Sequence, residues 1–194
     1  MADFWLYFKL GLTHVLDWNA YDHLLFLVVI TVPYLFKDWK RVFLLVTLFT
    51  LGHTASLILS AYEVISVNAR IVEFLIPLTI LIAALYNIFT AGKKNSNDKL
   101  GVLLMSAVFF GLIHGLGFSN YFKMMTQGLS SKILPLVEFA LGVEAAQIII
   151  VMVVLIIGFI GQTLFRFSRR DWVMITSAIV SGMVIPILIE NRIW

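Results

Sequence analysis

The chain has 194 residues, of which 61% are hydrophobic and only 13% are charged. Because this charged share is about half of that usual in soluble domains, the composition excludes an ordinary soluble enzyme and indicates a single-domain integral membrane protein over residues 1–194. The formal charge of +3 indicates no nucleic-acid partner, and the absence of cysteine excludes disulfides and thiolate metal sites.

The N-terminal segment is apolar but short. Residues 4–15 cannot cross a hydrocarbon core of about 30 Å, which needs roughly 20 apolar residues in a helix. The polar run Asp17-Trp18-Asn19 separates them from the next apolar stretch. We therefore expect a short interfacial or re-entrant helix here. No basic n-region precedes it, so we expect no removable signal peptide.

Six later stretches are apolar and long enough to span a membrane. The connections between them carry the charged residues and helix breakers expected of loops. The predicted spans cover residues 20–36, 42–62, 71–91, 100–118, 134–165 and 172–189. The predicted fold is therefore all-α, with six transmembrane helices and the short N-terminal helix before them.

Basic residues are concentrated in alternate connections, which hold nine of the fourteen lysines and arginines: Lys37, Lys40, Arg41, Lys93, Lys94, Lys99, Arg166, Arg169 and Arg170. Cytoplasmic loops carry the excess of basic residues in membrane proteins. The distribution predicts a multi-pass protein of the bacterial inner membrane with both termini outside the cytoplasm.

All four histidines lie inside or against an apolar stretch, where ionisable groups normally mark an ion path, a proton relay or a metal site. His14 precedes the polar run, and Asp22 and His23 follow it. Imidazoles and a carboxylate close in space suit zinc, nickel, cobalt or iron. Asp22 could equally belong to a capping box in which Asn19 is the N-cap.

His53 and His114 lie within predicted outward-running spans. Threonines share one side of the helix with His53, and three glycines surround His114 and allow close approach of a ligand or backbone. Contacts between membrane helices use the same small and hydroxylated residues, so packing explains both patterns as well. The depths of the two histidines, at 1.5 Å per residue, predict one outward-facing pocket shared with His14, Asp22 and His23.

Four further polar residues are candidates for an ion path. Glu144 and Gln147 are three residues apart near mid-membrane, where a glutamate is normally paired. Glu73 and Glu138 begin inward-running spans and could widen the approach to the pocket, although acids near helix ends are often simply solvated.

A short internal repeat links the two histidine spans. Phe49-x-x-x-His53 is followed by Val72-Glu73-Phe74, and Phe110-x-x-x-His114 is followed by Val137-Glu138-Phe139. A parallel repeat is common among transporters, whose sites lie at the repeat interface. Matches this short also arise by chance in apolar sequence.

These motifs resemble the HupE/UreJ family of small bacterial membrane proteins, proposed nickel or cobalt permeases of hydrogenase and urease systems. The resemblance covers most of the chain and rests on His14, Asp22-His23-Leu-Leu-Phe-Leu, Phe49-Thr-Leu-Gly-His53-Thr, Val72-Glu73 and Phe110-Gly-Leu-Ile-His114-Gly-Leu-Gly-Phe. It implies metal-binding roles for His14, Asp22, His23 and His114.

The chain departs from the better-studied branch of that family. There, a further histidine stands at the position of Gly111 and a glutamate at that of Gly117, and fewer residues separate the first histidine from the Asp-His pair. The sequence is therefore similar to the second, less characterised branch.

The preferred function is a permease for a divalent transition metal, nickel, cobalt or zinc, bound by His14, Asp22, His23, His53 and His114. This interpretation assigns no catalytic residue and favours a transporter over an enzyme. Two alternatives stay open: a zinc-dependent intramembrane hydrolase, and a non-catalytic assembly or sensor subunit whose histidines join helices. The expected partners are the lipid bilayer and the metal ion, with a second copy of the chain or metalloenzyme-maturation proteins as further candidates.

Overall fold

The computed structural model describes residues 2–17, 21–92 and 100–194, and these residues form helices joined by short connections. In chain order the helices are α1 (Ala2–Val15), α2 (Asp22–Thr31), the 3-10 helix η1 (Phe36–Asp38), α3 (Trp39–Ala61), α4 (Ala69–Thr90), α5 (Leu100–Met125), α6 (Ile133–Thr163) and α7 (Arg169–Glu190). Within the described ranges, five helices, α3 to α7, are long and apolar enough to cross a membrane.

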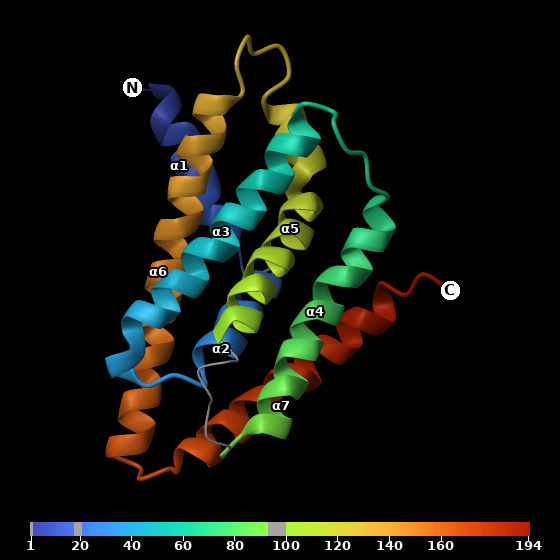
Figure 1. The fold of residues 1–194 in the computed structure, drawn as a ribbon. Coiled ribbons are helices and arrows are strands. Elements are labelled where there is room, and N and C mark those ends of the chain that lie inside the picture. Colours follow the sequence, from blue (N-terminus) through green and yellow to red (C-terminus); the bar gives the residue numbers. More distant parts are fainter. Residues whose placement is uncertain (1, 18–20, 93–99) are drawn as a thin grey trace.

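The helices other than α2 and η1 associate in three pairs, and the short helix α2 packs against several of them (Figure 1). α1 lies along α6, α3 along α5, and α4 along α7. Two of these pairs depend on glycine: a Cβ atom at Gly52 or Gly111 would collide with a carbonyl oxygen across the α3–α5 contact, and one at Gly11 or Gly142 would do so between α1 and α6. Small residues let membrane helices approach this closely.

The predicted continuous span over residues 20–36 is not confirmed, because α2 contains only ten residues. Proline has no N–H, so Pro33 cannot donate the helical hydrogen bond to the carbonyl of Val29. The amide of Asn87 on α4 donates to that carbonyl instead, at 2.7 Å. Helix α2 therefore ends near Pro33, which lacks a backbone N–H donor, and the side chain of Asn87 satisfies the carbonyl oxygen of Val29 that is left free.

Helix α1 does not lie across the end of the bundle, as an interfacial helix would. Tyr7, Gly11 and Val15, spaced four residues apart, are all buried, and α1 runs beside the first half of α6 (Figure 1). With 14 and 10 residues, α1 and α2 follow one another through the bundle. At 1.5 Å per residue their lengths sum to about 36 Å, which is similar to one of the long helices.

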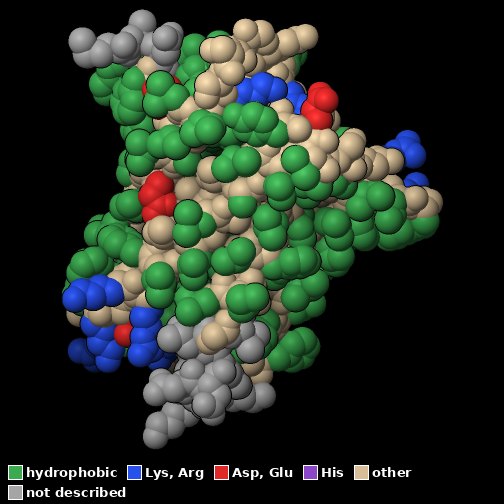
Figure 2. Space-filling model, turned by 45° about the horizontal axis from the view of Figure 1, so that its top comes forward, with side chains coloured by type: hydrophobic (Ala, Val, Ile, Leu, Met, Phe, Trp, Pro, Cys, Tyr) green, Lys and Arg blue, Asp and Glu red, His purple; other side chains and the backbone are tan. Residues whose placement is uncertain are grey.

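The basic connections described by the structure gather at one end of the molecule. The α2–α3 and α6–α7 connections meet at the lower end in Figure 1, and Figure 2 shows a group of Lys and Arg side chains there below a mainly hydrophobic surface. Lys93, Lys94 and Lys99 lie outside the described residues. The other predicted spans agree with the helices to within about three residues, except that α5 continues from Phe118 to Met125. The orientation in the membrane stays a prediction.

Candidate metal centre

The four histidines of the chain lie together in the interior of the bundle, although four different helices supply them. The ring centroids of His14 and His23 are 4.6 Å apart, and those of His23 and His114 are 5.2 Å apart. His53 lies 5.8 Å from His14 and 5.9 Å from His23. Residues separated by up to 100 positions thus share one site, which we call the histidine cluster.

Three of these rings form a group that could hold a metal ion. One ring nitrogen from each of His14, His23 and His53 lies within 4.8 Å of the other two. Nitrogen ligands at about 2.0–2.1 Å from a tetrahedral ion are roughly 3.3 Å apart, so binding an ion would draw the rings closer together. Imidazole nitrogens suit zinc, nickel, cobalt and copper.

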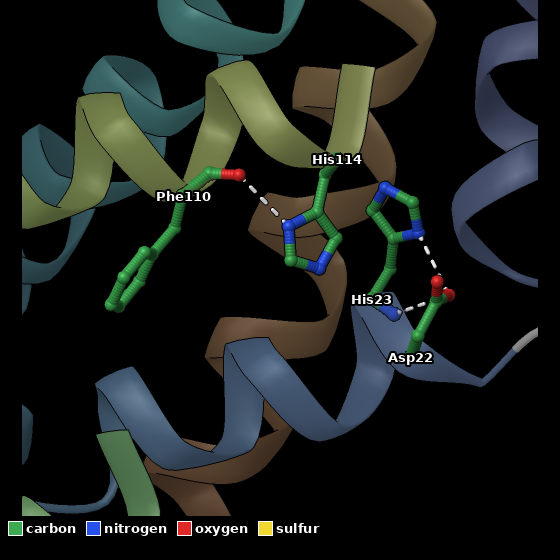
Figure 3. Close-up of polar contacts among 4 residues, drawn as sticks. All are labelled: Asp22, His23, Phe110 and His114. Atoms are coloured by element: carbon green, nitrogen blue, oxygen red, sulfur yellow. Dashed lines mark hydrogen bonds and ion pairs between the residues drawn. The ribbon is translucent and has the colours of Figure 1, made fainter. Parts of the chain in front are cut away.

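Asp22 orients His23 (Figure 3). Its Oδ1 accepts a hydrogen bond from the backbone N–H of His23 at 2.8 Å and lies 3.1 Å from the Nδ1 of the same residue. With the proton on Nδ1, the lone pair of Nε2 is available, which is the usual arrangement of a metal-binding histidine and its carboxylate partner. The sequence predicted both Asp22 and His23 as metal ligands, and the structure places the carboxylate of Asp22 against the ring of His23. The alternative capping box is not formed, because α2 begins at Asp22 with Tyr21 as its N-cap, and Asn19 lies outside the described residues.

His114 is oriented in the same way by a backbone group. Its Nδ1 lies 2.9 Å from the carbonyl oxygen of Phe110, one turn earlier on α5 (Figure 3). A carbonyl can only accept, so Nδ1 carries the proton and Nε2 has a free lone pair. His114 lies beside His23, as a fourth imidazole next to the group of three.

The histidine cluster concentrates buried nitrogen atoms that have no hydrogen-bond partner in the protein. They are the Nε2 atoms of His14, His23 and His114 and both ring nitrogens of His53. Leaving a buried polar atom unpaired costs about 1–3 kcal/mol, and such atoms are normally few and scattered. A neutral imidazole has one lone pair, so four of these five nitrogens, one on each ring, could donate to a bound cation, and the other nitrogen of His53 carries a hydrogen.

Phenylalanines enclose the histidine cluster on two sides. Phe118 and Phe139 stack at 5.0 Å and contact His14 and His53. On the other side Phe26, Phe49 and Phe110 form a layer that we call the aromatic floor, with Phe26 4.7 Å from Phe49 and 5.6 Å from Phe110. Phe49 and Phe110 each stand one helical turn before a histidine, as the sequence repeat indicated, but the sequence did not predict that phenylalanines enclose the site.

The site has a hollow on one side and a cavity beyond the floor. The hollow reaches His14, which is partly exposed, whereas His23, His53 and His114 are buried; it is lined by Leu10, Thr13, His14, Leu16, Asp17, Phe118 and Tyr121. The cavity, of about 180 Å³, is mainly apolar, and Phe26 and Phe110 form part of its wall. His14 is therefore the member of the cluster nearest to solvent or lipid.

Glu144 and Gln147 meet threonines of α3. The hydroxyl of Thr47 donates to Oε1 of Glu144 at 2.6 Å, and Thr50 contacts both Oε2 of Glu144 and Oε1 of Gln147. Thr50 stands three residues before His53, so this polar group begins one helical turn from the histidine cluster. The predicted pairing of Glu144 with neighbouring polar groups is therefore observed.

The two glutamates of the sequence repeat differ in environment. Glu138 is 5% exposed and its Oε2 has no hydrogen-bond partner. Glu73 is exposed and lies by the surface hollow formed with the C-terminal residues Glu190 to Trp194. The repeat therefore holds for the histidines, which both enter the cluster, and fails for the glutamates.

The fold and the site together define a helical membrane protein with a buried cluster of oriented imidazoles. A family model described as HupE / UreJ protein matches residues 1–192, and the chain therefore belongs to the HupE/UreJ family. The family consists of membrane proteins generally linked to nickel and cobalt transport. Neither the curated proteins nor the solved structures contain a match to this chain.

Proposed function

We propose that this chain is a permease for a divalent transition metal ion of the nickel, cobalt and zinc class, and that it binds this ion through His14, His23 and His53, with His114 as a fourth imidazole. The observation that carries the proposal is the convergence of ring nitrogens from three helices within 4.8 Å. A site whose ligands come from different helices changes its coordination if those helices shift relative to one another, and a transported ion requires such a change.

The supporting groups agree with this assignment. Asp22 and the carbonyl of Phe110 both hold a proton on Nδ1, so that the Nε2 atoms of His23 and His114 stay available as donors. Hydrogen-bonded ligands of this kind are typical of built metal sites. The hollow that reaches His14, with Asp17 on its rim, supports an approach route for a cation.

The remaining polar residues extend the route. Thr50, Glu144 and Gln147 follow the histidine cluster along α3 and α6, and Glu138 is a buried carboxylate on α6. In the predicted orientation, with both termini outside the inner membrane, these residues carry the ion inward from the outer half. Glu73 is exposed, so we do not include it in the proposed route.

Binding and uptake by the purified protein test the proposal. Isothermal titration with nickel, cobalt and zinc is expected to give one site per chain in wild type and a much weaker site in His53→Ala, with magnesium as a control ion that prefers oxygen ligands. Proteoliposomes are expected to take up at least one of the three ions faster than empty liposomes do.

The outcomes separate the alternatives. Wild-type protein that binds none of the three ions would contradict the proposal and favour an assembly or sensor subunit. A stoichiometric zinc ion that resists chelation, with uptake no faster than in empty liposomes, would contradict transport and favour an intramembrane hydrolase.

A further inference from the structure

The apolar cavity beyond the aromatic floor runs along the bundle. Phe26 and Phe110 lie at its end nearest the histidine cluster, and Tyr34 and Thr90 line the opposite end. Along α4 the lining extends from Ile82 to Thr90, which is about 12 Å at 1.5 Å per residue. The cavity is therefore long in the direction in which lipid chains lie in a membrane.

The cavity is open toward the outer surface of α4. Ile82 and Tyr86 line it and are nevertheless 52% and 41% exposed. Helix α4 is long and apolar enough to cross a membrane, so exposed side chains along it face lipid. A hydrocarbon chain can therefore enter from the bilayer without passing the histidine cluster.

The size and the polarity of the cavity suit a hydrocarbon chain. Its volume is about 180 Å³, and an apolar cavity of about 150 Å³ stays dry and binds benzene. The amide of Asn87 in the wall already donates to the carbonyl of Val29. The hydroxyl of Thr90 donates to the carbonyl of Tyr86 at 2.7 Å. An occupant therefore meets mainly apolar surface.

Two arginines stand at the end of the cavity remote from the histidines. The guanidinium of Arg169 donates to the carbonyl of Pro33, which lines the cavity. The side chain of Arg170 lies beside Gly92, two residues after Thr90, and its Cδ would be 3.2 Å from a Cβ atom there. In the described ranges (2–17, 21–92 and 100–194) neither arginine is within ion-pair distance of a carboxylate. Both keep N–H donors for an anion, since a guanidinium has five.

The surroundings of the two arginines are basic as well. Of the described residues at this end, only Asp38 and Asp171 are acidic, and both accept local hydrogen bonds. The basic residues described here are Lys37, Lys40, Arg41, Arg166, Arg169 and Arg170. This excess of positive charge favours an anionic headgroup over a zwitterionic one, and basic pockets between transmembrane helices bind anionic headgroups.

We propose that this cavity binds an anionic phospholipid, with an acyl chain between α4 and α5 and the headgroup phosphate on Arg169 and Arg170. A guanidinium matches a phosphate group through two parallel hydrogen bonds. The aromatic floor separates this site from the histidine cluster, so the proposal is independent of the metal ion and of transport. A bound chain would fill the space between the helices and stabilise their contact.

Mass spectrometry of the intact purified chain tests the headgroup. The protein is equilibrated with equal amounts of phosphatidylglycerol and phosphatidylcholine that carry the same acyl chains. Wild type is expected to retain one phosphatidylglycerol in preference to phosphatidylcholine. The double variant Arg169→Gln, Arg170→Gln is expected to bind it on the order of 30-fold more weakly, because each basic side chain near the membrane surface contributes about 1 kcal/mol.

Arg70→Gln, Arg192→Gln is the matched double variant, since it removes the same charge at the opposite ends of α4 and α7. It is expected to bind phosphatidylglycerol as wild type does. Equal retention of the two lipids by wild type, or equal losses in the two double variants, would overturn the proposal.

Thermal unfolding in detergent tests the acyl chain. Phosphatidylglycerol is expected to raise the unfolding temperature of wild type, because a ligand stabilises the folded state that binds it. Ala83→Phe, which fills the cavity from α4, is expected to lose this response, and the smaller change Ala83→Leu is expected to reduce it. Ala178→Phe adds the same ring at an exposed position of α7 and is expected to keep it. An unchanged response in both Ala83 variants, or the same rise with inorganic phosphate in place of the lipid, would overturn the proposal.

Discussion

His23 and Asp22 are neighbours in the chain, and the carboxylate of Asp22 lies 3.1 Å from the Nδ1 atom of the His23 ring. This contact fixes which nitrogen of His23 faces the other histidines. Under the proposed function the adjacent pair is a metal ligand and its supporting carboxylate, and the two members are expected to respond differently to substitution.

Substituting Asp22→Ala is expected to weaken metal binding by about 10–100-fold, the usual effect of removing a carboxylate that supports a metal-binding histidine. The number of nitrogen ligands, measured by X-ray absorption, is expected to stay the same, because the imidazoles remain. Titration calorimetry with nickel, cobalt and zinc gives the affinity. Asp38→Ala is the matched control, since Asp38 accepts a backbone hydrogen bond from Leu35 at the far end of α2. Equal losses in both variants would show that Asp22 has no special role.

The four histidines are expected to contribute unequally. Replacing His14, His23 or His53 by alanine removes one of the three converging nitrogens. Each change is expected to lower the affinity on the order of 100-fold. This loss corresponds to about a quarter of the binding free energy of a typical structural zinc site. His114→Ala is expected to cost less, because its ring stands beside the group. The same loss in all four variants would instead indicate a symmetrical four-histidine site.

Gly111 is expected to be essential for the fold around His53. A Cβ atom there would collide with the carbonyl of Phe49 and lie 3.0 Å from the backbone nitrogen of His53. Gly111→Ala is therefore expected to destabilise the protein by about 1–3 kcal/mol, as overpacking does in cores. Thermal unfolding in detergent measures the change.

Gly182 provides the matched control for this prediction. A Cβ atom at Gly182, on α7, would meet nothing within 4 Å. Gly182→Ala is expected to be neutral or to stabilise the helix by up to about 1 kcal/mol, because alanine has the higher helix propensity. If both variants unfold at the wild-type temperature, the close contact between α3 and α5 does not govern stability.

Glu138 and Glu73 have the same sequence context and different environments, which makes them a natural pair for comparison. Glu138→Gln is expected to slow metal uptake, because it removes a buried carboxyl group next to the aromatic enclosure at Phe139. Glu73→Gln is expected to leave uptake unchanged, because Glu73 is exposed and lies near the C-terminal residues. Initial uptake rates in proteoliposomes compare the two variants. A larger effect at Glu73 would contradict the assigned route.

Most of the helices follow from hydropathy, because each long apolar stretch can satisfy its backbone only as a helix. The first span was the exception. Residues 20–36 contain enough apolar residues, but Pro33 removes a donor, and only the three-dimensional position of Asn87 shows how the chain tolerates a helix that ends inside the bundle. The packing of α1 along α6 depends on Gly11 and Gly142, which are 131 residues apart, and no local pattern reveals that contact.

The candidate site was predictable in its residue types and less so in their roles. A histidine in an apolar span is unusual enough to be selected by itself, and the structure brings all four together. The role of Asp22 depends on which ring nitrogen it contacts, and the separation of Glu138 from Glu73 depends on burial. The aromatic floor was not predicted, because phenylalanine is common in lipid-facing helices and the repeat at Phe49 and Phe110 does not show where their rings lie. The carbonyl of Phe110 also orients His114.

The aromatic floor has an electrical consequence. Phe26 and Phe49 are fully buried and Phe110 completes the layer, so under the proposed function an ion that passes this apolar layer moves through part of the membrane voltage. Each elementary charge that moves through 100 mV changes its energy by about 2.3 kcal/mol, or about 4.6 kcal/mol for a divalent ion. That energy corresponds to an accumulation of roughly a thousandfold. Under the proposed function, the resting potential of the cell would therefore set how far the ion could be concentrated.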